Sequence, residues 1–207
     1  AFVRGLRHPT LGNQCVSNTV ELKRSAVLTG RNGSGKTTLA KSLAIAAIVG
    51  HQFGLAPCTK AQLPPLSTIR CDMNVPDTNE RDSLFEAEGR RCLELVTELQ
   101  ESPDGFHLCV FDELFSGTNA DEALEAAVGV LQNMVANGRT RFMVTTHMHA
   151  LGPRLGEELT QSLTMEVDEN GKPTHTAELG VTESSGARDT LVRIGFTPEQ
   201  LGAGGVG

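Results

Sequence analysis

The stretch GRNGSGKT, residues 30 to 37, constrains the fold of this chain more than any other feature of its sequence. It follows a short β-branched run at 24 to 30, which predicts a strand, and precedes an Ala- and Leu-rich stretch at 37 to 50 with helical spacing. Glycines let the backbone N–H groups of such a loop approach a phosphate, and the helix N-terminus adds partial positive charge. The pattern G-x-x-x-x-G-K-[ST] in this context therefore predicts a phosphate-binding loop.

The same stretch supplies most of the candidate nucleotide ligands. The residues whose groups are expected to face the phosphates are Gly30, Asn32, Gly33, Ser34, Gly35, Lys36, Thr37 and Thr38. Lys36 is expected to reach the β- and γ-phosphates of ATP, and the hydroxyl of Thr37 to bind Mg²⁺. The alternative is a glycine-rich turn that caps a helix and binds nothing, but pattern and context together argue against it.

Two adjacent carboxylates follow a buried strand in VFDELFSGTNADEA. The continuous apolar run at 106 to 111 is typical of a central strand that is covered on both faces. Asp112 is expected to hold Mg²⁺, and Glu113 is the candidate general base that activates the attacking water. Adjacent acids are costly to ionise together without a cation, so the pair favours a Mg²⁺–nucleotide site over a solvated acidic strand end.

A histidine pair follows the next predicted strand, RTRFMVTT at 139 to 146. We expect His147 to sense the γ-phosphate or to orient the water, with a purely structural role as the alternative. His149 lies two residues further on and is expected to be structural. No third ligand at suitable spacing accompanies the pair, so no metal other than Mg²⁺ is expected.

The remaining segments complete a layered pattern. Residues 79 to 101 predict an amphipathic helix that begins near Asp82 and Ser83, and residues 120 to 138 predict a second helix that ends at Asn137-Gly138. Residues 162 to 179 predict a hairpin around an Asn-Gly turn.

Residues 54 to 78 contain four prolines and predict a loop-rich connection, in which Pro64 and Pro65 break any regular element. The strands and helices elsewhere alternate along the chain. That alternation predicts the α/β class, with a mainly parallel central sheet flanked by helices.

Composition limits the classes of function. The chain has 207 residues, of which 39% are hydrophobic, and this predicts one core and a single domain. The net charge of -7 argues against non-specific binding of a polyanion such as DNA by this surface alone. Five cysteines without a CxxC pair favour free thiols in a reducing, intracellular compartment. No apolar run long enough to span a membrane is present, so no membrane association is expected.

Five motifs in this order resemble the ATPase domain of the MutS family of DNA mismatch-repair proteins. They are HPTL (8 to 11), TGRNGSGKTTLA (29 to 40), RDSLFEAEGRRCLEL (81 to 95), FDELFSGTNADEA (111 to 123) and VTTHMHAL (144 to 151). The resemblance implies an ABC-like P-loop NTPase fold that forms one domain over residues 1–207, with its core at 5–202. It also implies a closing hairpin and a short helical segment at the C-terminal end.

The resemblance further implies that ATP hydrolysis with Mg²⁺ is coupled to a homodimer or heterodimer, in which each subunit completes the site of its partner. Ser83, in a segment similar to the family's S-T-F-x-x-E signature, is then expected to approach the γ-phosphate of the partner. Ser83 also begins an S-x-x-E capping box, so a helix cap is the alternative. SGTNADEA resembles the family's interface loop, which implies that Gly117, Thr118 and Asn119 lie at the dimer contact. A helix cap is the alternative for Asn119.

Some positions depart from the family pattern. CVSN, at 15 to 18, aligns with a segment that commonly brings an aromatic ring to the adenine, whereas this chain offers Cys15 and contains no Trp or Tyr. Cys15, Val16 and His175 are the candidate adenine contacts. Asp82 stands where the family usually has Gly, and the interior of the glycine-rich loop is closer to that of ABC proteins.

Mismatch recognition in this family lies in N-terminal mismatch-binding, connector, lever and clamp regions. The chain is therefore expected to be a fragment that meets DNA through regions absent from it. One alternative is an ABC- or SMC-type ATPase subunit, against which the missing L-S-G-G signature weighs. Another is an ATP-gated dimerisation module with little turnover, against which Asp112, Glu113 and His147 weigh.

Overall fold

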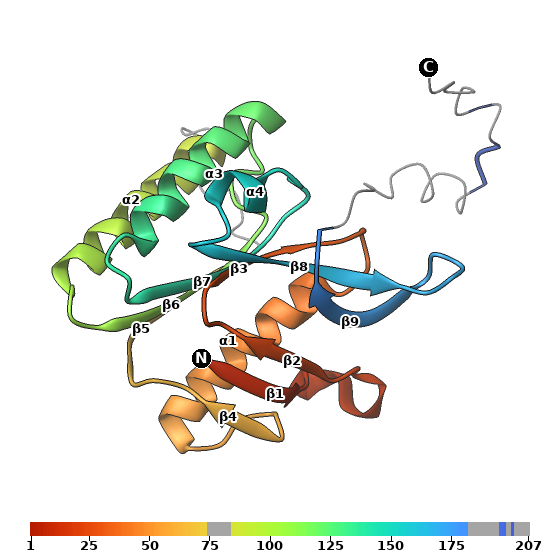
Figure 1. Cartoon of the computed structure of the whole chain (residues 1–207), viewed down its shortest axis with the longest axis horizontal. Coiled ribbons are helices and arrows are strands. Elements are labelled where there is room, and N and C mark those ends of the chain that lie inside the picture. The colour runs from red at the N-terminus through yellow and green to blue at the C-terminus, as the bar shows by residue number, and fades with distance from the viewer. Residues whose placement is uncertain (74–83, 182–194, 198–199, 201–207) are drawn as a thin grey trace.

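The computed structural model of the chain describes residues 1–73, 84–181, 195–197 and 200, and Figure 1 shows their arrangement. The regular elements in chain order are β1 (Phe2–Leu6), the 3-10 helix η1 (Pro9–Gln14), β2 (Asn18–Glu21), β3 (Ser25–Thr29), α1 (Lys36–Phe53), β4 (Lys60–Gln62), β5 (Leu66–Asp72), α2 (Leu84–Glu101), β6 (Phe106–Asp112), α3 (Ala120–Val135), β7 (Thr140–Thr145), α4 (Leu151–Leu155), β8 (Thr160–Val167) and β9 (Pro173–Leu179). The alternation of strands and helices confirms the predicted α/β class.

The central sheet has six strands in the order β5-β6-β7-β3-β8-β9. The first five run parallel, and β9 runs antiparallel to β8. The mainly parallel sheet and the hairpin at 162 to 179 are thus confirmed. At the hairpin turn, the Asp168 carboxylate accepts hydrogen bonds from the backbone N–H groups of Asn170 and Lys172 at 2.9 Å each.

Helices cover both faces of this sheet, with α2, α3 and α4 on one face and α1 on the other (Figure 1). Side chains of β6 alternate between the two layers: Cys109 and Phe111 pack with α2 and α3, whereas Leu108 and Val110 pack with α1. A strand covered on both faces favours apolar side chains at successive positions. This is why β6 is apolar from Leu108 to Phe111, while the buried His107 at its start donates from Nε2 to the Ser102 carbonyl at 2.9 Å.

The helices follow their predicted positions with shifted ends. In α2 the buried residues Cys92, Leu95 and Leu99 recur at helical spacing, as the amphipathic pattern predicts. Helix α1 extends beyond the predicted residue 50 to Phe53, and Gly54 ends it with a φ of 68°. Helix α3 ends at Val135, before the predicted Asn137-Gly138. The side chain of Asn137 instead accepts hydrogen bonds from the backbone at the start of β7.

The prediction of an irregular connection at 54 to 78 is wrong for β4 and β5. Strand β5 is an edge strand of the central sheet, and β4 pairs with β1 in a separate antiparallel sheet of order β2-β1-β4. Pro64 and Pro65 lie between the two strands, where the chain passes from one sheet to the other, and interrupt neither. An edge strand with half-buried side chains also carries a weak apolar pattern.

Three further expectations concern the chain as a whole. All five cysteines are free thiols. Within the ranges given above, no helix has the length and apolar character needed to cross a membrane. Most of the helical segment predicted after the hairpin lies outside the described residues, as do Asp82 and Ser83.

Candidate active site

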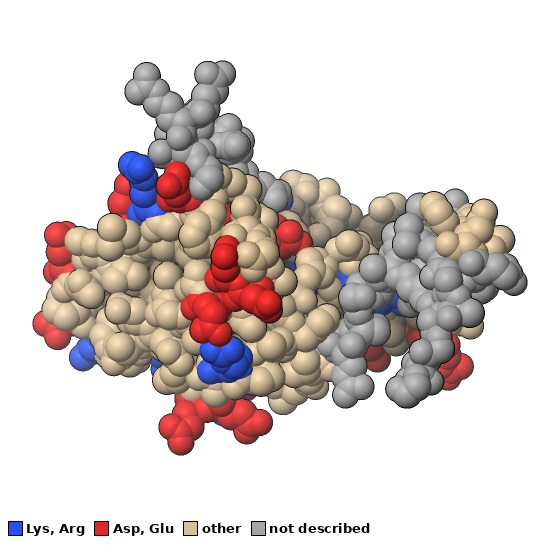
Figure 2. Space-filling model, turned by 90° about the horizontal axis from the view of Figure 1, so that it is seen from above, with Lys and Arg blue, Asp and Glu red and all other residues tan. Residues whose placement is uncertain are grey.

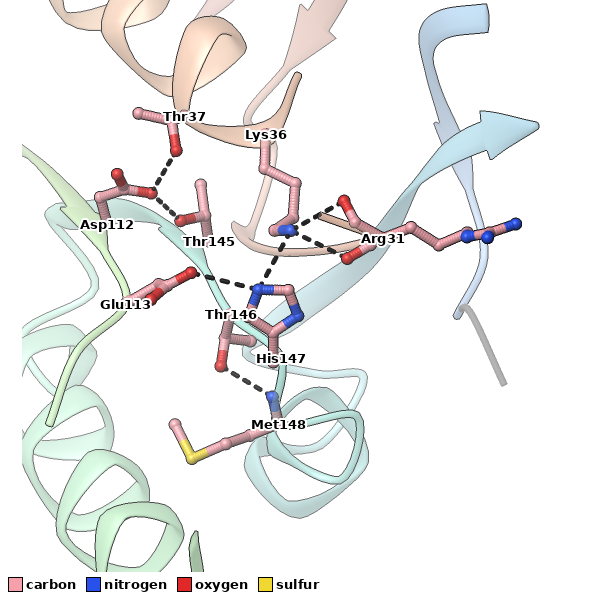
Figure 3. A network of polar contacts seen from close by, with 10 residues as sticks. Arg31, Lys36, Thr37, Asp112, Glu113, Thr145, Thr146, His147 and Met148 are labelled. Atoms are coloured by element: carbon pink, nitrogen blue, oxygen red, sulfur yellow. Dashed lines mark hydrogen bonds and ion pairs between the residues drawn. The ribbon is translucent and has the colours of Figure 1, made fainter. Parts of the chain in front are cut away.

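The carboxyl ends of three neighbouring parallel strands form the site. Strand β3 leads into the glycine-rich loop, β6 ends at Asp112, and β7 ends at Thr145. Since these strands are parallel, the segments that follow them meet at one edge of the sheet, where open α/β sheets bind their ligands. Figure 3 shows the side chains that come together there.

The glycine-rich loop has a backbone that only glycine adopts easily. Gly33 and Gly35 have φ values of 74° and 104°, and Gly35 is the N-cap residue of α1. A Cβ on Gly30 would lie 2.9 Å from the Cβ of Met165. The side chain of Ser34 is fully buried, and its Oγ has no hydrogen-bond partner among the described residues. The loop thus brings a helix N-terminus and an unsatisfied hydroxyl to one place.

Lys36 is held inside this loop. Its side chain is 6% exposed, and Nζ donates to the carbonyl oxygens of Gly30 at 2.8 Å and Arg31 at 3.2 Å. Burial lowers the pKa of Lys36, although the carboxylates of Glu113 and Asp112 oppose this effect. The ammonium group is therefore poorly hydrated and is stabilised by oxygen atoms around it.

A carboxylate with two hydroxyl partners lies beside the lysine. Thr37 Oγ1 donates to Asp112 Oδ1 at 3.0 Å, and the Thr145 hydroxyl donates to the same oxygen. Thr145 is fully buried, so its hydroxyl holds the Asp112 carboxylate from the interior of the protein. Thr145 was not predicted as a site residue; the available signal was a threonine directly after the apolar residues Phe142 to Val144.

Glu113 and His147 face each other across the strand ends (Figure 3). Glu113 Oε1 lies 3.1 Å from His147 Nε2, which also lies 3.4 Å from Lys36 Nζ. One ring nitrogen can either donate to the carboxylate or accept from the ammonium group, but not both. Burial and the Lys36 charge lower the pKa of His147, whereas Glu113 opposes them. Glu113 has a left-handed φ of 58°, a conformation that non-glycine residues seldom keep outside constrained sites.

The loop forms one wall of a cavity of about 440 Å³. Its lining includes Glu113, the residues of the loop from Asn32 to Thr38, and all three candidate adenine contacts, Cys15, Val16 and His175. The three candidates come from two separate parts of the fold: Cys15 and Val16 lie between η1 and β2, and His175 lies on β9. The glycine-rich loop thus lines one end of the cavity, and side chains of mixed polarity line the other.

The loop after Glu113 packs against α2 of the same chain. A Cβ on Gly117 would lie 2.8 Å from both the Leu84 Cβ and the Phe85 backbone N, so this position requires glycine. Asn119 is the N-cap residue of α3, where its Oδ1 accepts from the Glu122 N–H at 3.0 Å. Thr118 donates to the Glu122 carboxylate at 2.6 Å. The capping role of Asn119 is thus observed, and the dimer contact of this loop stays a prediction.

His149 differs from its neighbour His147. Both of its ring nitrogens are buried, and neither has a hydrogen-bond partner in the described part of the chain. The described residues also contain no group of three or more His, Cys, Asp or Glu side chains arranged to hold a metal ion. A site for Mg²⁺ would therefore draw on the hydroxyl and carboxylate of Thr37 and Asp112 together with ligand oxygens.

Comparison with known proteins gives consistent matches. A family model described as MutS domain V matches residues 26–189. The Endonuclease MutS2 of Staphylococcus haemolyticus is 28% identical over 198 residues, and that of Thermotoga petrophila is 29% identical over 199 residues. Each alignment covers 92% of this chain, but only 25% and 26% of the respective relatives. The chain therefore spans about a quarter of the length of these curated relatives.

Proposed function

The chain belongs to the MutS family, whose domain V model matches most of its length, and we propose that it binds ATP through a P-loop and hydrolyses it with Mg²⁺. The observation that carries the proposal is the meeting of Lys36, the Thr37–Asp112 pair and Glu113 at the edge of one cavity. Each of these groups has a distinct role in phosphoryl transfer to water.

The loop residues fit the phosphates of a nucleotide. The buried Ser34 hydroxyl has no partner among the described residues, and a phosphate oxygen is a suitable acceptor for it. The Lys36 ammonium, which now donates to loop carbonyls, has the reach to exchange these for β- and γ-phosphate oxygens. The N-terminus of α1 adds its partial positive charge at the same end of the cavity.

The donor set beside the loop fits Mg²⁺. A threonine hydroxyl and a carboxylate, 3.0 Å apart, are hard oxygen ligands, and Mg²⁺ usually takes only one or two protein ligands beside phosphates and waters. Bound at Thr37 and Asp112, the ion would neutralise phosphate charge. Thr145 fixes the orientation of the Asp112 carboxylate through its own hydroxyl.

Glu113 is the general base in this mechanism. It takes a proton from the attacking water while the bond between the γ-phosphorus and the ADP oxygen breaks. His147 holds the Glu113 carboxylate through Nε2 and orients it, and it lies close enough to Lys36 to sense the γ-phosphate. The low pKa of His147 favours a neutral ring near pH 7, which can serve as either donor or acceptor.

Turnover is expected to need a second subunit. Ser83 lies outside the described residues and is proposed to approach the γ-phosphate of the partner. The loop with Gly117, Thr118 and Asn119 is proposed to lie at the contact between the two subunits. Its packing on α2 of the same chain would link Glu113 to the segment that carries Ser83.

In the whole protein, this chain would serve as the ATP-driven dimerisation module of a MutS-like DNA mismatch-repair protein. The net charge is -7, and acidic side chains are scattered over the face shown in Figure 2. The described residues of that face form no broad basic patch. We therefore place the DNA contacts in other regions of the longer protein.

The first test is ATP binding and phosphate release by the chain and by its Lys36→Ala variant. We expect Lys36→Ala to lose ATP binding, because the charge that faces the phosphates is removed. Lys41→Ala is the matched control, since Lys41 lies on the same helix and does not line the cavity. ATP binding that survives Lys36→Ala unchanged would refute the assigned phosphate site.

A further inference from the structure

The end of the cavity away from the phosphate loop has two walls that belong to different sheets. One wall comes from η1, the start of β2 and the connection between them, which includes Val16, and the other is the side chain of His175 on β9. Strand β2 belongs to the three-stranded sheet and β9 to the six-stranded sheet. The spacing between the walls therefore depends on contacts between the two sheets.

Asn18 connects the two sheets, and both the nitrogen and the oxygen of its side-chain amide form hydrogen bonds. Its Nδ2 donates to the carbonyl oxygens of Val16 at 3.4 Å and His175 at 3.0 Å, and its Oδ1 accepts from the Ala177 N–H at 2.7 Å. The residue is 7% exposed. Both donors of the amide and one acceptor position are used. Two of the three hydrogen bonds join this wall to β9, and the third holds Val16 within the wall that carries Asn18.

His175 continues this connection to the phosphate loop. Its Nδ1 lies 2.9 Å from the carbonyl oxygen of Ser34, and because a carbonyl only accepts, Nδ1 carries the proton. Gly35 leaves room for the ring, since a Cβ there would lie 3.3 Å from Nδ1. His175 also has a left-handed φ of 62°, a conformation that persists where neighbouring contacts hold it. Asn18 supplies one of these contacts through the His175 carbonyl.

Other hydrogen bonds, which do not involve Asn18, fix the position of the glycine-rich loop. Arg31 Nη1 donates to the Gly171 carbonyl in the hairpin turn at 3.0 Å, and Lys36 bonds to carbonyls of the loop itself. Loss of the Asn18 amide would release Val16 and the His175 backbone while these contacts remain. The two ends of the cavity are thus held by largely separate sets of bonds.

We propose that Asn18 is a positioning residue that sets the spacing between the two walls of the base-binding end of the cavity. The inference rests on the proposed function, in that the cavity holds a nucleotide. Asn18 acts through Val16 and His175, whose positions decide how closely a base is enclosed. Its loss should weaken the binding of the base and leave the binding of the phosphates intact.

The test compares two ligands that share the phosphates but differ in the base. ATP and inorganic tripolyphosphate are each used, with Mg²⁺, to displace a fluorescent ATP analogue from the 207-residue chain. For Asn18→Ala we expect ATP to bind about tenfold more weakly, from the loss of buried hydrogen bonds, and tripolyphosphate affinity to change less than about twofold. Asn18→Asp keeps the size and the Ala177 acceptor but places a carboxylate against two carbonyls, so the same selective loss is expected.

Asn137→Ala is the matched control, because the Asn137 side chain likewise makes three hydrogen bonds, all accepted by Oδ1, but at the amino end of β7, away from the cavity. It should change neither affinity. Equal losses for ATP and tripolyphosphate in both Asn18 variants would mean that Asn18 is merely structural, and this would overturn the inference. Unchanged ATP affinity in the Asn18 variants would also overturn the inference. The same holds if tripolyphosphate fails to displace the fluorescent analogue from the wild-type chain. A wild-type chain that fails to bind ATP would instead refute the proposed function.

Discussion

Replacing Glu113 with glutamine separates chemistry from binding. The Glu113 side chain is 52% exposed, and its contact with the His147 ring at 3.1 Å is a solvent-exposed polar contact that contributes less than about 1 kcal/mol to stability. Glutamine has nearly the shape of glutamate and can still form a hydrogen bond to the His147 ring, so the stability of the fold and the affinity for ATP should change little. Without the general base, turnover should fall by about 10²- to 10⁴-fold, which corresponds to about 3 to 5 kcal/mol in the barrier.

Three measurements on Glu113→Gln test this reasoning: phosphate release, ATP affinity, and solution mass with and without Mg²⁺-ATP. We expect loss of turnover, nearly unchanged affinity, and a shift from monomer to dimer only with ATP, because the bound ATP persists. Glu125→Gln is the control. Glu125 is likewise an exposed glutamate with a side-chain partner, Arg154 at 2.8 Å, and it does not line the cavity.

Two outcomes would contradict the mechanism at different points. Wild-type turnover in Glu113→Gln would show that another group activates the water. A monomer under both conditions, with ATP shown to be bound, would show that this chain does not pair by itself through a shared site. Glu125→Gln should keep wild-type turnover and ATP affinity, because its side chain does not line the cavity.

Other predictions concern stability and reactivity. Leu131→Ala removes a fully buried side chain and should lower the free energy of unfolding by about 2 to 5 kcal/mol in chemical denaturation; a loss below about 1 kcal/mol would contradict the packing. Asn119→Ala removes the α3 cap and should cost about 1 kcal/mol in the same assay, and unchanged stability would argue against the cap. In thiol titration, exposed Cys71 should react far sooner than Cys109, whose burial raises its pKa to about 12; equal rates would refute this. Burial lowers the pKa of Lys36, so the folded chain loses this proton before the unfolded chain does. The free energy of unfolding of the wild-type chain, compared with that of Lys36→Met, should therefore rise as the pH increases toward 10.5, the ordinary pKa of lysine. A fall over this range would contradict a pKa lowered by burial.

Much of the fold was predictable because local patterns agreed with tertiary burial. Strand β6 is apolar from Leu108 to Phe111 because helices cover both faces of the sheet, and the glycine-rich loop lies between a strand and a helix as its pattern requires. Strands β4 and β5 were missed for the opposite reason. An edge strand and a three-residue strand are half-buried or exposed, and two prolines between them resemble a break in structure.

The sequence by itself determined which groups carry the candidate chemistry, because Lys36, Asp112 and Glu113 follow strands in recognisable local patterns. Only the tertiary structure decided how these groups meet. Thr145 reaches Asp112 because β6 and β7 are parallel neighbours, and His175 reaches the loop because a hairpin folds back beside β3. Asn18 joins two sheets through contacts 157 and 159 residues apart in the chain. A local pattern reflects the backbone around it, whereas such contacts depend on the packing of separate elements.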